Sequence, residues 1–271
     1  MKVKEIREAL LPVAKDSADY EARLLFSFYS GLSPSQILAE NPDFYSEELA
    51  EAIEKRLKYE PLAYILGFTE FYGERYIVSP DCLIPRSDTE LIVEYAISNL
   101  PKNANFIDLC TGSGCIAISI LSHRKDCRAI ALDISEKAIS IAKENAAANG
   151  VSDRIGFVLC DLLNEEFSYT GFDAIISNPP YIRSDVISSL SPDVLREPKL
   201  ALDGGEDGMK FYRRILEICG DRLNENGFFL FETGYDQKSD IIALAKEKGY
   251  LCKCIIDYGK NHRGAILKKP D

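Results

Sequence analysis

The sequence predicts an α/β protein in which a doubly wound, mostly parallel sheet follows a small helical bundle and a β-hairpin. Residues 1–65 carry helical periodicity throughout, whereas from about residue 105 onward short apolar runs alternate with amphipathic stretches. Such alternation is typical of a parallel sheet with helices on both faces. Ligands of these sheets bind at the carboxyl ends of the strands, so we expect the functional residues there.

The N-terminal segment shows the start and stop signals of helices. Ser46 precedes two glutamates and a run in which an apolar residue recurs at every fourth position. A serine cap and an acidic first turn stabilise the amino end of a helix. Gly31 ends an earlier helical run, and Ser33 with the following proline begins the next one. We therefore expect a helical domain over residues 1–66.

The hydrophobic period changes after this segment. In residues 67–86 aromatic and β-branched residues alternate with polar ones, and Gly73 supplies a turn, so this stretch is predicted to be a β-hairpin linker. Ser87 and Glu90 have the spacing of a capping box in front of the apolar run LIVEYAI. A second domain is expected over residues 87–271.

The second domain contains the alternating elements. Strands are expected at NFIDLC, RAIALDI, RIGFVLCD, FDAIISN, GFFLFETG, CKCIIDYG and GAILKK. Helices are expected at GCIAISILSHR, EKAISIAKENAAANG, KFYRRILEICGDRL and SDIIALAKEKG. We expect the last two strands to form an antiparallel pair.

Charge and hydropathy favour a protein or small-molecule substrate. The net charge of −11 opposes tight binding of long nucleic acids, which depends on neutralising phosphates. No stretch approaches the ~20 apolar residues of a membrane span, and the first residues alternate charged with apolar positions. We expect a cytoplasmic protein without membrane association, and a monomer by default.

The cysteines and histidines do not form a metal-binding pattern. None of the eight cysteines form a C-x-x-C pair, and the two histidines, His123 and His262, are far apart. Zinc sites usually combine such pairs at short spacing. We expect reduced core thiols and no metal.

A glycine-rich turn follows the first predicted strand of the second domain. Gly112 and Gly114, with Ala117, fit the fingerprint in which glycines let the backbone approach a ligand at the start of a helix. Asp133 ends the second strand, where an acid would bind ribose hydroxyls. The pattern predicts an adenosine site of unspecified type; a tight turn without ligand is the alternative. A phosphate-binding P-loop is disfavoured because no Gly-Lys-Ser/Thr follows.

Two further strand ends favour a methyltransferase over a dehydrogenase. Asp161 follows the third strand, where its carboxylate could accept from an adenine amine or simply cap a loop. Asn178-Pro179-Pro180-Tyr181 ends the fourth. The two prolines stiffen the backbone, so that the Asn178 side chain and the Pro179 carbonyl offer two fixed acceptors.

Two acceptors suit an NH₂ group on a planar carrier, against which Tyr181 could pack. The lone pair of an amide nitrogen is delocalised, so the nitrogen is a poor nucleophile. Holding it ~3–3.5 Å from a sulfonium methyl would help, and no strong base is needed before attack. A stiff turn capped by Asn178 is the structural alternative.

These strand ends resemble the class I S-adenosylmethionine-dependent methyltransferases that modify planar NH₂ groups. Longer segments narrow the resemblance, namely EPLAYILGFTEFYG, LIPRSDTELIVE, DLCTGSG, SNPPYI, EPKLALDGGEDGMKFYRRI and GYDQ. From about residue 20 onward the chain closely resembles the protein glutamine N5-methyltransferases of peptide chain release factors.

The resemblance implies a Rossmann-like class I methyltransferase sheet and an activity. The substrate would be the glutamine of the Gly-Gly-Gln motif in a release factor, and S-adenosylhomocysteine would be the product. The N-terminal domain would help to hold the release factor. The cofactor would be bound by Cys110, Thr111, Gly112, Ser113, Gly114, Asp133, Asp161, Leu162 and Asn178. The target amide would be bound by Asn178, Pro179, Pro180 and Tyr181, which form the catalytic group.

The chain departs from this family pattern at three positions. Cys110 stands where the family usually has glycine, so how closely the backbone approaches the cofactor at this position is left open. Leu162 occupies a position that is often aromatic, and Ser87 replaces a proline. For Arg86, Asp88, Glu90 and Glu197, the sequence leaves open whether they bind substrate or only shape the structure.

Two other functions stay open at this point. An adenine-N6 methyltransferase of nucleic acid shares the four-residue motif, although the acidic charge opposes it. A non-catalytic module could keep the fold and hold a translation factor without modifying it.

Overall fold

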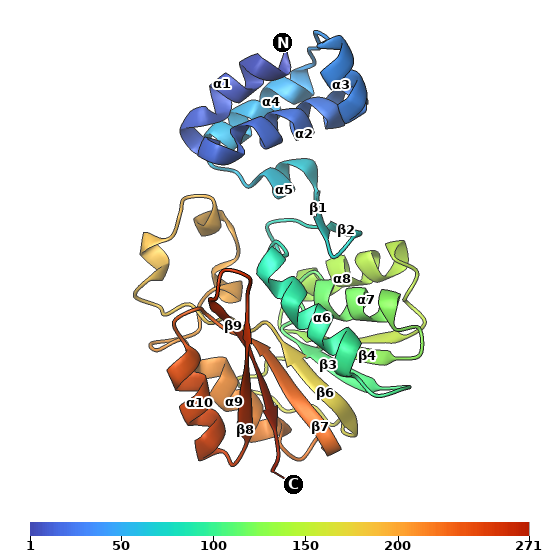
Figure 1. Ribbon diagram of the computed structural model, residues 1–271, viewed down its shortest axis with the longest axis vertical. Helices are drawn as coiled ribbons and strands as arrows, with labels where there is room; N and C mark the ends of the chain where they lie inside the picture. Colours follow the sequence, from blue (N-terminus) through green and yellow to red (C-terminus); the bar gives the residue numbers. More distant parts are fainter. Residues whose placement is uncertain (271) are drawn as a thin grey trace. The chain divides into compact units, whose positions relative to one another are not determined.

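The computed structural model describes residues 1–270 and divides into two compact units (Figure 1). The first unit comprises Met1–Phe68 together with Ser191–Arg196, and the second comprises Thr69–Leu190 and the chain from Glu197 onward. The chain therefore leaves the second unit once more after residue 190. Within the first unit, the Arg196 guanidinium donates to the carbonyl of Lys58 over 2.9 Å.

The first unit is helical, and its sequence signals act as predicted. Ser46 accepts a hydrogen bond from the amide of Leu49 over 3.1 Å, Gly31 is left-handed at φ 72°, and Ser33 forms a capping box with Gln36. Each signal satisfies backbone groups that a helix end leaves free. The helices are α1 (Val3–Ala14), α2 (Ala18–Ser30), α3 (Pro34–Glu40), α4 (Glu47–Leu57) and α5 (Leu62–Leu66).

The core of the first unit combines apolar packing with one ion pair. Ile6, Leu25 and Leu49 are fully buried between α1, α2 and α4. Glu21 and Arg56 form a buried pair, with 2.7 Å between Arg56 Nε and Glu21 Oε2. Removing one partner of such a pair leaves a buried charge uncompensated, so the pair fixes α2 against α4.

A β-hairpin follows, formed by β1 (Phe68–Phe71) and β2 (Glu74–Ile77) with Gly73 in the turn at φ 82°. The capping box predicted at Ser87 and Glu90 is wrong. Residues Ser87–Thr89 form a 3₁₀ turn before α6 (Glu90–Asn99), and within the described chain no side chain caps either one. Glu90 instead accepts from the amide of Tyr72 over 2.9 Å, because the hairpin turn leaves that N–H without a strand partner.

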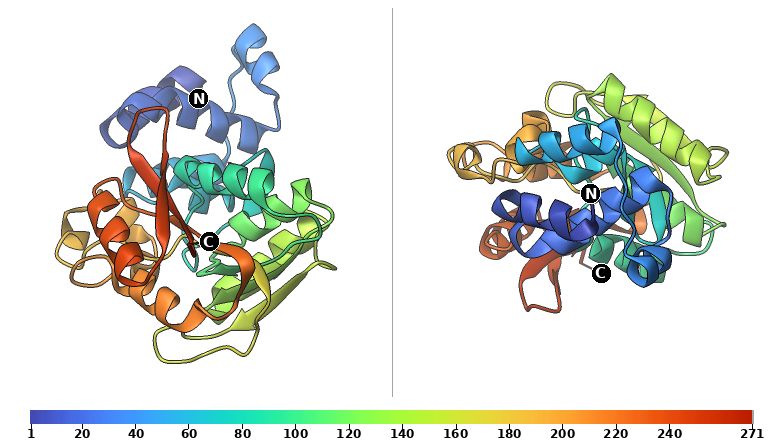
Figure 2. Two further views of the ribbon diagram at one scale, coloured as in Figure 1. Left: turned by 60° about the horizontal axis from the view of Figure 1, so that its bottom comes forward. Right: turned by 90° about the horizontal axis from the view of Figure 1, so that it is seen from above.

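The second unit contains a seven-stranded sheet in the order β5-β4-β3-β6-β7-β9-β8 (Figures 1 and 2). The pairs from β5 to β7 are parallel, and β9 is antiparallel to both β7 and β8. The predicted doubly wound sheet and its antiparallel final pair are confirmed. The strands are β3 (Asn105–Leu109), β4 (Arg128–Asp133), β5 (Ile155–Leu159), β6 (Phe172–Ser177), β7 (Leu223–Glu232), β8 (Leu251–Ile256) and β9 (His262–Lys268).

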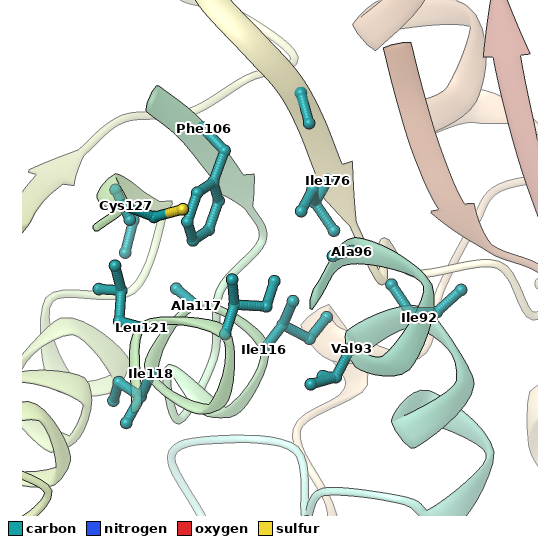
Figure 3. Packing of buried hydrophobic residues seen from close by; sticks show 14 of the residues in the cluster. Ile92, Val93, Ala96, Phe106, Ile116, Ala117, Ile118, Leu121, Cys127 and Ile176 are labelled. Atoms are coloured by element: carbon teal, nitrogen blue, oxygen red, sulfur yellow. The ribbon is translucent and has the colours of Figure 1, made fainter. Parts of the chain in front are cut away.

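Helices cover both faces of this sheet. On one face lie α6, α7 (Cys115–His123) and α8 (Glu136–Ala148), and on the other lie α9 (Lys210–Cys219) and α10 (Lys238–Glu247) (Figure 1). Neighbouring residues of β3 serve opposite faces, as the pleat requires: Phe106 packs with α6 and α7, and Ile107 packs with α9 and α10. Figure 3 shows Ile116 of α7 and Ile176 of β6 among the side chains of the core between the sheet and α6 and α7.

The strand register brings the functional ends of the sheet into one row. Leu109 pairs with Ser177 of β6 and with Leu132 of β4, and Ser177 pairs in turn with Phe231 of β7. The residues that follow these positions therefore leave the sheet at the same level. The order in which strands are added to the sheet also reverses here, because β4 and β6 lie on opposite sides of β3, and such a switch point is where doubly wound sheets bind ligands.

No helix within residues 1–270 is both long and apolar enough to span a bilayer.

We predict that Gly114→Ala lowers the free energy of unfolding by about 1–3 kcal/mol more than Gly150→Ala. Both glycines are left-handed, at φ 83° and φ 67°. A Cβ at Gly114 would lie 2.7 Å from Ile118 Cδ1 and 3.1 Å from Ala142 Cβ, whereas at Gly150 it would meet no atom of the described chain within 4 Å. Urea unfolding of both variants measures the difference. Equal losses would show that the α7–α8 contact is not tight at Gly114.

Candidate active site

The turn after β3 is built from left-handed residues. Cys110, Gly112 and Gly114 have φ of 60°, 55° and 83°. The amide of Thr111 donates to the carbonyl of Leu132 over 3.0 Å, which ties the turn to β4. Cys110 holds a conformation that costs a residue with a side chain roughly 1–2 kcal/mol relative to glycine. The backbone therefore keeps the shape of a glycine turn despite the cysteine.

The buried acid Asp108, on β3, holds this turn in place. The hydroxyl of Thr111 donates to Asp108 Oδ2 over 2.6 Å, and Asp108 Oδ1 has no hydrogen-bond partner among residues 1–270. Burial raises the pKa of Asp108 to about 7, although the hydrogen bond from Thr111 opposes the shift. Thr111 thus points into the fold and acts by holding the turn.

Asp133 ends β4 beside the turn. Its carboxylate accepts from the amide of Gly112 over 2.8 Å and from the amide of Ser135 over 2.9 Å. Burial raises the pKa of Asp133, and these backbone hydrogen bonds oppose the shift. The acid is therefore held rigidly by backbone donors, with lone pairs left to accept from a ligand.

Asp161 leaves β5 in a short turn of its own. Its oxygens accept from the amide of Leu163 over 3.0 Å and from the side chain of Asn164 over 2.7 Å. The Asn164 hydrogen bond lowers the pKa of Asp161, so the acid is ionised at neutral pH. Asp161 caps its loop and faces the ligand cavity as well, so both of the roles that the sequence left open are compatible with its position.

Asn178 and Tyr181 lie at the end of β6, where Pro179 and Pro180 are buried. The Asn178 side-chain amide donates through Nδ2 to the hydroxyl of Thr89 over 3.3 Å. The Tyr181 hydroxyl turns the other way and donates to Glu232 Oε1 over 3.2 Å. The two polar side chains of the motif are therefore both anchored inside the protein.

Glu232, at the end of β7, is a site residue that sequence reasoning missed. It is buried, its backbone carbonyl accepts from the hydroxyl of Tyr212 over 2.7 Å, and burial raises the pKa of its carboxyl to about 7. The sequence did contain a signal, because Glu232 is an acid directly after the apolar run GFFLF, just as Asp133 and Asp161 follow their strands.

The segment after Tyr181 packs closely against the motif. A Cβ at Gly204 would lie 2.7 Å from Tyr181 Cα, so only glycine permits this approach. Gln237 donates through Nε2 to the Tyr181 carbonyl over 3.0 Å. Glu197 forms an ion pair with Arg86 and also accepts from the amide of Ile84.

The strand ends and these segments enclose a cavity of about 220 Å³. Of the residues that the sequence assigned to the site, Cys110, Gly112, Asp133, Asp161, Leu162, Asn178 and Pro180 line it. Thr111, Ser113, Gly114, Pro179 and Tyr181 lie outside its lining and shape the turns behind it. The remaining walls come from residues 80–83, 134–135, 198 and 200–201 with Leu132, Ala138, Cys160, Leu163 and Phe211.

The lining suits an adenosine-containing cofactor. Leu132, Ile134 and Leu162 offer an apolar wall, and Asp133 and Asp161 place two acceptors at its edge. A planar base fits the first and hydroxyl or amino groups fit the second. The open backbone at Gly112, where an added Cβ would meet no described atom within 4 Å, also lets a ligand approach closely.

The described residues show a site without metal-ligand geometry. No group of three or more His, Cys, Asp or Glu side chains within residues 1–270 is placed to hold a metal ion. Cys82, Cys110 and Cys160 border the cavity, but burial raises the pKa of each thiol, which makes them poor nucleophiles.

The geometry of the site agrees with the protein families to which the chain is similar. A model of the methyltransferase small domain matches residues 88–206, and a model of the PrmC N-terminal domain matches residues 3–67. A release factor glutamine methyltransferase from Thermodesulfovibrio yellowstonii is 36% identical over 92% of both chains. The chain belongs to the release factor glutamine methyltransferase family.

Further members of this family have the same extent. The release factor glutamine methyltransferase of Neisseria gonorrhoeae is 37% identical over 85% of both chains, and that of Agrobacterium fabrum is 37% identical over 92% of this chain and 90% of its own. These enzymes use S-adenosylmethionine as methyl donor, and the family membership makes this chain an S-adenosylmethionine-dependent methyltransferase.

A solved structure shows the same fold at low sequence identity. The hMettl16 catalytic domain is 16% identical and aligns over 84% of both chains with a TM-score of 0.59. The predicted Rossmann-like class I methyltransferase fold is therefore confirmed.

We predict that Asp133→Ala weakens S-adenosylmethionine binding roughly tenfold to a hundredfold, because hydrogen bonds to a charged acceptor are worth about 1.5–3 kcal/mol. Isothermal titration calorimetry measures the change. Asp126→Ala is the matched control, because Asp126 also accepts from a loop amide, that of Asn103, but lies outside the cavity lining. Unchanged affinity in Asp133→Ala would remove this acid from the cofactor site.

Proposed function

We propose that this protein transfers a methyl group from S-adenosylmethionine to the side-chain amide nitrogen, N5, of the glutamine in the Gly-Gly-Gln motif of peptide chain release factors. One observation carries the proposal. Asn178 lines the cavity while its Nδ2 donates to Thr89, so its carbonyl oxygen is left to accept from an incoming NH₂ group. The names of the family members supply the substrate class.

The site residues divide the work of binding and orientation. Asp133 would hold the ribose, and Asp161 with Leu162 the adenine. The turn from Cys110 to Gly114 would pass along the methionine portion. These roles stay predictions, supported by the shared cavity. The bound cofactor supplies an electrophilic methyl group on a sulfonium sulfur.

The acceptors at the end of β6 would position the amide. Asn178 Oδ1 and the Pro179 carbonyl would each accept one N–H of the target, while Pro180 and Tyr181 shape the wall around it. Fixing both N–H protons points the nitrogen at the methyl group and holds it at reacting distance, which offsets the poor nucleophilicity that the delocalised lone pair gives an amide nitrogen. The arrangement needs no general base before the nitrogen attacks. The S–CH₃ bond would break as the N–CH₃ bond forms, S-adenosylhomocysteine would leave, and the methylated nitrogen would then release one of its protons.

The rest of the chain has supporting proposed roles. Residues 1–66 would bind the release factor, which the match to the PrmC N-terminal domain supports, residues 67–86 would link the domains, and residues 87–271 would carry out methyl transfer. We propose that the protein is cytoplasmic, since release factors act on ribosomes, and that it is a monomer. We expect no stable binding of nucleic acid, given the net charge of −11.

Transfer of labelled methyl from S-adenosylmethionine to a purified bacterial release factor tests the function. We expect label on the native factor and none on a factor whose Gly-Gly-Gln glutamine is alanine, or on duplex DNA. Label on DNA would favour an adenine methyltransferase instead. Tight binding of the factor without any transfer would indicate a non-catalytic module.

We predict that Asn178→Ala lowers kcat about a hundredfold while the dissociation constant of S-adenosylmethionine changes little, because the lost hydrogen bond acts on the reacting amide. Asn149→Ala is the control, because the side-chain amide of Asn149, directly after α8, donates to the backbone carbonyls of Arg75 and Asn145. Steady-state kinetics with the release factor and calorimetry with the cofactor separate the two effects. Near-wild-type turnover of Asn178→Ala would remove Asn178 from the reaction.

A further inference from the structure

Asn178 has a side chain with two different faces, and only one of them suits the reaction. Its oxygen accepts hydrogen bonds and its nitrogen donates them. A glutamine NH₂ needs the oxygen, so a rotated Asn178 would present donors to a donor. Whatever fixes the orientation of this amide therefore controls whether the substrate can bind productively.

The neighbour of Asn178 is Thr89, which is 1% exposed and comes from the 3₁₀ turn before α6. Its hydroxyl accepts from Asn178 Nδ2 over 3.3 Å. A hydroxyl has a single proton. If that proton is given to another acceptor, the oxygen of Thr89 can only accept from Asn178, and the Asn178 oxygen must point the other way.

Glu232 is the acceptor beside Thr89. The Thr89 hydroxyl interacts with this carboxyl and helps to lower its pKa, and the Tyr181 hydroxyl donates to Oε1 over 3.2 Å. Glu232 is 2% exposed, and Oε2 has no hydrogen-bond partner within ordinary distance among residues 1–270. Leaving a buried carboxylate oxygen without a donor costs free energy, so the orientation in which the Thr89 hydroxyl proton points toward Glu232 is favoured.

We propose that Glu232 and Thr89 are positioning residues that set the orientation of the Asn178 amide, and that Glu232 also anchors Tyr181, so that one buried acid holds both polar side chains of the Asn-Pro-Pro-Tyr motif. The inference rests on the proposed methylation of glutamine. Neither residue lines the cofactor cavity, and Thr89 is hydrogen-bonded to Asn178, which does, so their effect on the reaction passes through Asn178.

The charge of Glu232 decides which way the hydrogen bonds run. An ionised Glu232 accepts from Thr89, whereas a protonated one can donate to it. In the second case Thr89 is free to donate to Asn178, which favours the opposite face of the amide. Burial raises the pKa of Glu232 to about 7. The productive orientation should therefore be present above about pH 7 and be lost as the pH falls below it.

Other charged groups around Glu232 come from each element packed against it. Asp88 in the 3₁₀ turn raises the pKa of Glu232, and Arg263 on β9 lowers it. Tyr212 on α9 and Cys115 on α7 are also near, but burial raises the pKa values of both, and they stay neutral in this range.

Two further groups titrate near the same pH or lie close by. Asp108 has a pKa of about 7 as well, but it holds the cofactor turn through Thr111, so its titration should appear in cofactor affinity. His262 bonds to Thr233 rather than to Glu232, and burial lowers the pKa of its imidazole.

The test compares Thr89→Val with Thr89→Ser in labelled methyl transfer to the release factor at pH 8. Valine keeps the shape but removes the hydroxyl, and serine keeps the hydroxyl. We expect Thr89→Val to lose at least about tenfold in kcat, with a cofactor dissociation constant within about twofold of wild type, and Thr89→Ser to recover most of the rate. Thermal unfolding of both variants checks that they fold.

The pH profile separates positioning from a structural effect. We expect wild-type kcat to fall below about pH 7, and Glu232→Gln, whose charge cannot change, to have a low kcat without that fall. A wild-type rate in Thr89→Val, or the same pH limb in Glu232→Gln, would overturn the inference while leaving the proposed function intact. A wild-type enzyme that does not methylate the factor at pH 8 would overturn both.

Discussion

The alignment of strand ends is the constraint on which the rest of this structure depends. Leu109, Leu132, Ser177 and Phe231 lie level across four neighbouring strands, so the residues that follow them emerge along one edge of the sheet. Paired strands are held about 4.8 Å apart by their ladder of hydrogen bonds. The glycine turn, Asp133, Glu232 and the amide of Asn178 are therefore brought together by backbone pairing, independently of any contact among their side chains.

Two buried acids then make that edge rigid. Asp108 holds Thr111 under the cofactor turn, and Glu232 holds Tyr181 under the proline pair. Burial raises the pKa of both carboxyls to about 7, which shows that their environment disfavours the charge. Folded enzymes retain such groups where a site must keep one geometry, and both acids act on turns whose backbone lines or supports the cavity.

The sequence predicted the sheet, and seven of the residues that it assigned to the site line the cavity, because both follow from local patterns. Apolar runs identify strands, and polar residues directly after them, such as Asp133 and Asn178, identify the ligand edge. It failed where a long-range partner replaced a local one: Glu90 bonds to the hairpin amide of Tyr72 instead of capping its own helix. Residues 80–83, 198 and 200–201 border the cavity only because their segments fold back over it, and no local pattern encodes that return.

A crystal structure with S-adenosylhomocysteine and a Gly-Gly-Gln peptide would show whether rigid acceptors at the end of β6 hold the target amide beside the cofactor. We expect hydrogen bonds from the glutamine NH₂ to Asn178 Oδ1 and to the Pro179 carbonyl, with Asn178 Nδ2 still bound to Thr89. A glutamine amide bound away from β6, or an Asn178 that presents its nitrogen to the substrate, would contradict this expectation.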